Sequence, residues 1–237
     1  MPVFVLVHGT GHGGWCWQTV APILRAEGFE VYAQTLTGVS DRSHLLGCGV
    51  DLTTHITDVT NLLHYWDLAD VVLVGHSYGG MVVSGVAATA PERLRQVIYL
   101  DAYVPEEGQS EVDLWPPEMR AEIEADAQES GGLRSPPSPE LMGIHDPELA
   151  DWVQKRITPH PVATYTEAVP VGSGRSAALP RAYIRCSEGP LTGVFAPFAE
   201  KAKTSGWPVR ELAAGHDAML TAPDEVARLL LELAHTG

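Results

Sequence analysis

The chain has 237 residues, of which 45% are hydrophobic and 19% charged, an ordinary balance for one folded domain. Its 30 acidic and 15 basic residues give a formal net charge of −15. Nucleic acids and anionic membranes select basic surfaces, so this charge argues against both as partners. No apolar run approaches the ~20 residues that a membrane-spanning helix needs, and no leader pattern is seen. A cytoplasmic protein is therefore expected.

Three cysteines, Cys16, Cys48 and Cys186, are widely spaced and odd in number. This pattern matches neither a disulfide framework nor the ligand spacing of a metal site. We expect free thiols in a reducing compartment and no bound metal.

Short apolar runs alternate along the chain with longer helical patterns. The first, third and fourth runs are almost continuously apolar, as in strands that are buried on both faces of a parallel sheet. The predicted strands are residues 3–7, 31–33, 71–74, 97–100, 182–186 and 209–212.

Helices are predicted between these strands. Thr54 is expected to cap a helix with one apolar face, residues 79–90 form a small apolar helix, and a last helix begins at T-A-P-D-E, residues 221–225. This alternation predicts an α/β fold with a doubly wound, mainly parallel sheet of about six strands.

One region breaks the alternation. Residues 105–179 are rich in proline and acid, with W-P-P-E, S-P-P-S-P and T-P-H-P, and short helices are expected around 118–129 and 147–156. We therefore predict a core made of residues 1–104 and 180–237, with residues 105–179 inserted between two of its strands.

The motif G-H-S-Y-G, residues 75–79, stands between a predicted strand and a predicted helix. It fits G-x-S-x-G, a sharp turn that strains the serine backbone and exposes its hydroxyl. Small residues two positions before and after the serine, here Gly75 and Gly79, let the strand and the helix approach closely. We predict that Ser77 is a nucleophile.

A serine hydroxyl needs a general base, and ten histidines are available. His216 follows the last predicted strand, so it and Ser77 both lie at the carboxyl ends of strands, where parallel sheets place their sites. His216 is the predicted base. His8, His12 and His76 are expected to be structural, and the other histidines to lie on solvated faces or in the insertion.

An oxyanion hole needs two backbone N–H groups that point at the developing negative charge. Tyr78, directly after the serine, is expected to supply one of them. The glycine-rich loop H-G-T-G-H-G-G-W, residues 8–15, is expected to supply the other. The alternative interpretation of this loop is a plain glycine turn that leads into a helix.

Four longer motifs share one pattern: L-V-H-G-T-G-H-G-G-W-C-W, V-G-H-S-Y-G-G-M, Y-L-D-A-Y-V-P and G-H-D-A-M-L-T-A-P. Together they resemble one branch of the α/β-hydrolase superfamily, which contains plant methyl-ester hydrolases of the salicylate-binding type, hydroxynitrile lyases and small bacterial esterases. The resemblance covers residues 3–104 and 181–235. It implies an α/β-hydrolase fold in which residues 105–179 form a cap over the serine and shape an apolar pocket.

The resemblance also implies roles for single residues. Ser77 would be the nucleophile, His216 the base, and the N–H groups of Thr10 and Tyr78 the oxyanion hole, without a cofactor. The lyases of this branch carry threonine and lysine at the positions that hold Gly9 and Asp217 here. Lyase activity is therefore not expected, and Asp217 is expected to be structural.

The third member of the predicted triad departs from the family pattern. The family places an aspartate soon after the penultimate strand, where this chain reads C-S-E-G-P with Gly189 at that position. Glu188, 28 positions before His216, is the favoured acid. Asp101, at the end of another strand, is the alternative, and a serine–histidine pair without an acid also stays open.

The predicted activity is hydrolysis of a small apolar or aromatic carboxylic ester through an acyl-enzyme. Because altered triads occur in this fold, a cyclase, a carbon–carbon lyase and a small-molecule receptor are the alternatives. Trp115, Trp152 and Tyr165 are expected either to line the pocket or to form the cap's own small core. A homodimer is compatible with the sequence.

Overall fold

The computed structural model describes residues 3–47, 49–172 and 174–235, so the thiol expected at Cys48 lies outside the described residues. Within these ranges, six strands form one sheet in the order β2-β1-β3-β4-β7-β8, and all neighbouring pairs are parallel. The strands are β1 Val3–Val7, β2 Glu30–Tyr32, β3 Val71–His76, β4 Leu94–Leu100, β7 Arg181–Cys186 and β8 Val209–Leu212. All the predicted strands are confirmed, with ends that differ by a few residues.

The central strands are apolar along their length because helices cover both faces of the sheet. Every residue of β1 and β3 is buried. Successive side chains point to opposite faces, so Val5 and Leu73 belong to one hydrophobic cluster, whereas Phe4 and Val72 belong to the other. This is the doubly wound arrangement that the sequence predicts.

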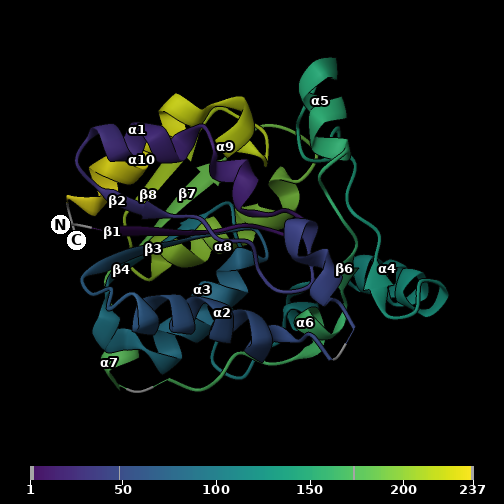
Figure 1. Cartoon of the computed structure of the whole chain (residues 1–237), viewed down its shortest axis with the longest axis horizontal. Helices are drawn as coiled ribbons and strands as arrows, with labels where there is room; N and C mark the ends of the chain where they lie inside the picture. The colour runs from purple at the N-terminus through teal and green to yellow at the C-terminus, as the bar shows by residue number, and fades with distance from the viewer. Residues whose placement is uncertain (1–2, 48, 173, 236–237) are drawn as a thin grey trace.

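Two helical layers enclose the sheet (Figure 1). On one face lie α1 Val20–Ala26 and α10 Pro223–Ala234, and on the other lie α2 Leu52–Tyr65, α3 Gly79–Thr89 and α8 Thr192–Thr204. Short helical segments complete the layers: η1 Gly14–Trp17, η2 Ser40–Leu45, η3 Pro91–Arg93 and α9 Ala218–Thr221. Among the described residues, no helix combines the length and the apolar character that crossing a membrane requires.

The start of α2 differs from the prediction. Asp51, and not Thr54, is the N-cap, since its carboxylate accepts a hydrogen bond from the Thr54 N–H at 2.8 Å. The Thr54 hydroxyl oxygen in turn accepts from the Asp51 N–H at 3.4 Å. Thr54 therefore occupies the third helical position of a capping box, which needs a polar side chain as much as the cap itself does.

The insertion between β4 and β7 lies mostly beyond the carboxyl ends of the strands, on the right in Figure 1. The two expected helices are present as α4 and α5. β5 and β6 pair antiparallel with Arg134 opposite His160, which joins two distant parts of the insertion. Its elements are η4 Glu111–Leu114, α4 Pro117–Glu129, β5 Leu133–Arg134, α5 Pro147–Gln154, β6 His160–Pro161, α6 Ala163–Thr166 and α7 Gly174–Ala177.

Candidate active site

Ser77 lies in the tight turn between β3 and α3. Its φ is +54°, a left-handed conformation that a serine adopts only under constraint. The constraint is the close packing of strand and helix: a Cβ on Gly75 would lie 2.6 Å from the Gly79 carbonyl oxygen, and a Cβ on Gly79 would lie 2.8 Å from that of Val7. No larger residue fits at either position, so the local sequence dictates the turn.

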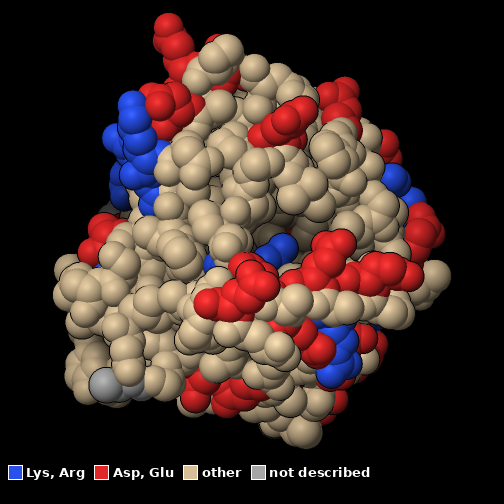
Figure 2. Space-filling view, turned by 90° about the vertical axis from the view of Figure 1, so that its right-hand side faces the viewer, with Lys and Arg blue, Asp and Glu red and all other residues tan. Residues whose placement is uncertain are grey.

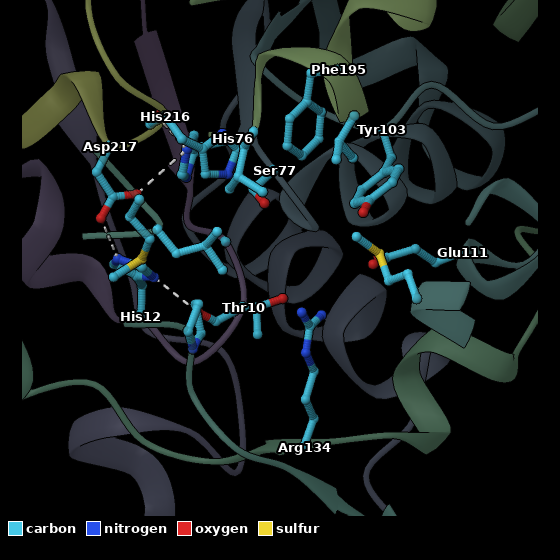
Figure 3. A pocket seen from close by; sticks show the side chains of 17 residues that line it. Thr10, His12, His76, Ser77, Tyr103, Glu111, Arg134, Phe195, His216 and Asp217 are labelled. Atoms are coloured by element: carbon cyan, nitrogen blue, oxygen red, sulfur yellow. Dashed lines mark hydrogen bonds and ion pairs between the residues drawn. The ribbon is translucent and has the colours of Figure 1, made fainter. Parts of the chain in front are cut away.

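The glycine-rich loop after β1 reaches the serine from the side. A Cβ on Gly9 would lie only 2.8 Å from the Cβ of Ser77. Thr10 and Ser77 both point into the same cavity (Figure 3). Among the described residues, the N–H groups of Thr10 and Tyr78 have no hydrogen-bond acceptor, so both are available to a bound oxyanion.

His216 follows β8, and its Nδ1 lies 2.7 Å from Oδ2 of Asp101. Asp101 directly follows β4 and is 1% exposed, and its other carboxylate oxygen accepts a hydrogen bond from the Cys186 N–H at 3.1 Å. The ring of Phe195 stacks on the imidazole with a centroid separation of 4.5 Å. The imidazole is therefore fixed in orientation by a buried carboxylate and an aromatic ring.

The preference for Glu188 as the carboxylate that contacts His216 is wrong in this structure. Glu188 is exposed on the turn that follows β7, and Asp101 occupies the position beside Nδ1. The difference lies in the direction of the side chains: Asp101 is turned inward and buried, whereas Glu188 is exposed, although β7 is the strand next to β8.

Asp217 is buried among histidines. Its Oδ2 lies 2.9 Å from Nε2 of His12, and Nδ1 of His12 lies 2.8 Å from the carbonyl oxygen of Thr10. A carboxylate and a carbonyl can only accept, so both ring nitrogens donate and His12 is an imidazolium. Burial opposes this charge, but Asp217 outweighs it and raises the pKa of His12, while His12 in turn lowers the pKa of the buried Asp217 carboxyl. The ion pair therefore ties the glycine-rich loop, through His12, to Asp217, the residue that follows His216.

His76 completes this group. Its Nε2 donates to the carbonyl oxygen of His216 at 3.0 Å, and its Nδ1 has no partner among the described residues. Burial and the neighbouring His216 hold the pKa of His76 well below its ordinary value, so the ring is neutral. His76, His216 and Asp217 each bring a nitrogen or oxygen to within 4.8 Å of the others, but these three side chains already serve the contacts above.

The remaining histidines divide into structural and surface positions. His8 is structural: its Nδ1–H donates to the Gly9 carbonyl oxygen at 2.9 Å, and its Nε2 accepts from the Leu36 N–H at 3.0 Å. The expectation of a solvated face is wrong for His55, which is fully buried. Its Nδ1 and the Tyr78 hydroxyl lie 2.8 Å apart, so this ring supports the residue after the serine.

A cavity opens in front of Ser77 and His216. Its lining is mainly apolar, and part of it comes from the insertion, which contributes Glu111, Met119, Arg134, Pro137, Leu141 and Met142. Sequence reasoning missed Glu111 and Arg134. A single acid in an acid-rich segment carries no local signal, and neither does a single arginine outside any motif.

The three aromatic residues of the insertion do not line this cavity. Trp115 and Tyr165 are buried and pack against each other with ring centroids 5.3 Å apart. Trp152 packs edge-on against Trp15 at 5.1 Å. They serve packing, but they do not form a separate core of the insertion, since Trp115 and Tyr165 belong to the large cluster that also holds Val5 and Leu73.

Comparisons with known proteins agree with this geometry. The alpha/beta hydrolase family matches residues 4–229. A carbendazim hydrolyzing esterase from Nocardioides sp. (strain SG-4G) is 40% identical over 244 residues, which cover 98% of this chain and 100% of the relative. Methylesterase 10 of Arabidopsis thaliana is 30% identical over 265 residues, with 98% and 91% coverage.

The fold recurs in a solved extracellular alpha/beta-hydrolase from a Paenibacillus species, described as sharing structural and functional homology with tobacco Salicylic Acid Binding Protein 2. The two structures agree with a TM-score of 0.87 at 24% sequence identity, over 98% of this chain and 99% of that chain. The motifs, the sheet order and these matches lead to one conclusion: the chain belongs to the alpha/beta hydrolase family.

Proposed function

We propose that the protein hydrolyses small carboxylic esters through an acyl-enzyme on Ser77. The observation that carries this proposal is the contact of 2.7 Å between Asp101 and His216, beside a serine held at a φ of +54°. The similarity to a carbendazim hydrolyzing esterase and to a methylesterase supports an ester as the substrate.

The contacts define the protonation of the catalytic histidine. Because the Asp101 carboxylate accepts the hydrogen on Nδ1 of His216, Nε2 keeps its lone pair and can take the Ser77 hydroxyl proton. As Oγ bonds to the ester carbonyl carbon, Asp101 stabilises the imidazolium that forms. The carbonyl oxygen becomes an oxyanion and accepts hydrogen bonds from the N–H groups of Thr10 and Tyr78.

The second half of the reaction reverses these proton movements. The bond between the carbonyl carbon and the alcohol oxygen breaks, and the leaving alcohol takes the proton from His216. A water molecule then gives a proton to His216 and attacks the acyl carbon. Collapse of this second intermediate returns the proton to Ser77 and releases the carboxylic acid.

We further propose that residues 105–179 act as a cap and that the substrate is apolar or aromatic. Several cavity-lining residues from that segment support the first point. The apolar side chains of Leu141, Leu191, Val194 and Phe195 support the second, because they offer no hydrogen bond to a polar substrate body. A cytoplasmic location, which the buried free thiols of Cys16 and Cys186 support, and a homodimer stay predictions.

The test uses methyl benzoate, phenyl acetate and carbendazim as probes. Wild-type protein is expected to turn over at least one of them and, in a rapid-quench experiment read by mass spectrometry, to carry the acyl group on the peptide that contains Ser77. Ser77→Ala should lose both the adduct and turnover. Tight binding without turnover in the wild type would instead indicate a receptor, and full activity in Ser77→Ala would overturn the assignment.

A further inference from the structure

Two ionisable side chains of the insertion enter the otherwise apolar part of the cavity. Figure 3 shows Glu111 and Arg134 pointing into it from sides away from Ser77 and His216. The mechanism above uses neither of them. On the face that carries the insertion, Figure 2 shows a hollow with basic atoms inside it and acidic side chains along its lower edge.

Glu111 is buried, and only one of its two carboxyl oxygens has a hydrogen-bond partner. It begins η4, where a capping box between Ser110 and Asp113 fixes the turn, and it is 1% exposed. Its Oε1 accepts a hydrogen bond from Nε1–H of Trp115 at 3.1 Å, whereas Oε2 has no partner among the described residues. A buried polar atom left unpaired costs about 1–3 kcal/mol, so its position at the cavity wall indicates a ligand group that pairs with it.

The environment of Glu111 favours its neutral form. Burial raises its pKa to about 8, although Arg134 and the hydrogen bond from Trp115 act in the opposite direction. Near neutral pH the carboxyl group is therefore mainly protonated, and Oε2 can carry a hydrogen for donation into the cavity.

Arg134 brings a second donor. It lies in β5, and its guanidinium carbon lies 5.9 Å from the ring centroid of Trp115 and 5.8 Å from that of Tyr165. Within the described part of the chain it forms no ion pair with a carboxylate, so its positive charge is not neutralised by a close partner. One N–H group of Arg134 is engaged by the Tyr165 hydroxyl, and its other N–H groups and the Glu111 hydroxyl are donors at one end of the cavity.

We propose that Arg134 and Glu111 form a donor subsite that binds a hydrogen-bond acceptor of the substrate, at the end remote from the scissile ester. The proposal rests on the proposed function, because it names which esters that site prefers. The acceptor is a carbonyl oxygen, a ring nitrogen or a carboxylate. An ester with only hydrocarbon at this end leaves the buried Glu111 donor and the half-buried Arg134 guanidinium without a substrate partner. Sites built for hydrogen bonding discriminate most strongly against such substrates.

The test compares methyl benzoate with the isomeric methyl pyridinecarboxylates, in which one ring C–H is replaced by nitrogen at almost unchanged size. The monomethyl esters of the benzenedicarboxylic acids form a second arm with an anionic acceptor. The measured quantity is the ratio of kcat/KM for each acceptor ester to that for methyl benzoate. Comparing this ratio between wild type and Arg134→Met cancels the different intrinsic reactivities of the esters.

We expect the ratio to fall about tenfold or more in Arg134→Met for at least one isomer, the loss of one good hydrogen bond from a charged donor. Arg134→Lys should restore part of it. The matched control is Arg120→Met, the same change at an exposed position of α4 that pairs with Glu124 at 2.9 Å, and it should leave the ratio unchanged. The proposal is supported if Arg134→Met lowers the ratio for the pyridine esters or for the carboxylate esters. The arm in which the ratio falls identifies the acceptor.

Glu111 is tested by two substitutions. Glu111→Gln keeps an oxygen for the Trp115 N–H and an amide donor for the cavity, so the ratio should stay near the wild-type value. Glu111→Leu removes the donor, and the ratio should fall. Melting temperatures and methyl benzoate turnover, measured for every variant, separate loss of selectivity from loss of folding.

The outcomes for the subsite and for the enzyme are distinguishable. Turnover of methyl benzoate with ratios that are the same in wild type and Arg134→Met for all isomers would overturn the donor subsite and leave the esterase intact. If the wild type turned over none of the esters, binding of the same esters to the Ser77→Ala protein would decide. There the acceptor esters should bind more tightly than methyl benzoate, and Arg134→Met should abolish the difference; equal affinities would refute the subsite.

Discussion

Asp101 contacts His216 across an intervening strand. Asp101 follows β4 and His216 follows β8, and β7 lies between those strands in the sheet, yet Oδ2 of one residue lies 2.7 Å from Nδ1 of the other. The intervening strand takes part in the contact, because the N–H of Cys186 at its end donates to the second Asp101 oxygen. Residues at the ends of three strands, β4, β7 and β8, therefore fix the position of the Asp101 carboxylate.

The first prediction concerns this carboxylate. Asp101→Asn should lower kcat by up to about 10⁴-fold, because the amide can present a donor to Nδ1 and stabilise the wrong tautomer of His216. Substrate should still bind, so KM should change much less than kcat. Glu188→Gln, a change of the same kind at an exposed position, is the control and should retain wild-type rates. Steady-state kinetics on one ester measures both variants, and the opposite ranking would return the role to Glu188.

A second prediction tests the contact between the glycine-rich loop and the serine. Gly9→Ala places a methyl group 2.8 Å from the Cβ of Ser77, so the loop or the turn must move. Turnover should fall by about 10²-fold or more, because donors of the oxyanion hole no longer meet the developing charge. The variant should also unfold more easily, by about 1–3 kcal/mol.

The control for this change is Gly193→Ala in α8, where a Cβ meets nothing within 4 Å. It should keep full activity and gain about 0.5–1 kcal/mol, because alanine favours a helix over glycine. Urea unfolding and initial rates measure both variants. Equal rates in Gly9→Ala and wild type would show that the loop does not position the oxyanion donors.

The third prediction follows from the raised pKa of Glu111. With a folded-state pKa of about 8 against an ordinary value of 4.5, the folded protein binds more protons than the unfolded chain between these pH values. The contribution of Glu111 to stability is therefore fully present below pH 4.5 and is lost as the pH rises to about 8, by up to roughly 4–5 kcal/mol. Glu111→Gln should flatten this part of the profile of unfolding free energy against pH. Parallel profiles for the two proteins would show that Glu111 titrates normally.

The fourth prediction concerns the buried pair of Asp217 and His12. The raised pKa of His12 contributes stability that is complete below its ordinary value of 6.5 and is lost as the pH rises through its folded-state pKa. The lowered pKa of Asp217 contributes stability that is present above 3.8 and is lost in acid. Asp217→Asn should therefore destabilise the protein most between pH 3.8 and 6.5, by about 3 kcal/mol, since it leaves His12 buried without its counter-ion.

Chemical unfolding over this pH range measures the effect. Asp224, an exposed acid in the first turn of α10, gives a matched Asp→Asn control that should change little. A constant difference between wild type and Asp217→Asn at all pH values would contradict the ionic pair.

The positions of Ser77 and His216, the proposed nucleophile and base, could be found from the sequence because their signals are local. The small residues around Ser77 are required by the packing of one strand against the next helix, and His216 follows a strand directly. The acid could not be predicted in this way. Counting positions along the chain favours Glu188, but the contact depends on which side chain turns inward at the end of its strand, and that is Asp101, one strand further from β8.

The two residues of the proposed donor subsite were beyond sequence reasoning for a different reason. Glu111 lies in η4, which has four residues, and Arg134 lies in β5, which has two. Elements this short show no periodic pattern, so nothing in the sequence marks Glu111 as buried among the exposed acids near it. Only the path of the chain brings it and Arg134 to one cavity. The helices α4 and α5, which have local start signals, were predicted correctly.

Gly11 binds the glycine-rich loop to the insertion through both of its backbone groups. Its N–H donates to Nδ1 of His160 at 3.1 Å, and its carbonyl oxygen accepts from the Thr158 N–H at 3.0 Å. His160 is also the residue that pairs with Arg134 in the small antiparallel ladder. Replacing the whole insertion with a foreign one would therefore break the support of the loop beside Ser77, whereas replacing the Arg134 side chain leaves the ladder unchanged. We therefore expect point substitutions of ladder side chains to preserve the loop beside Ser77, and a grafted insertion to disturb it.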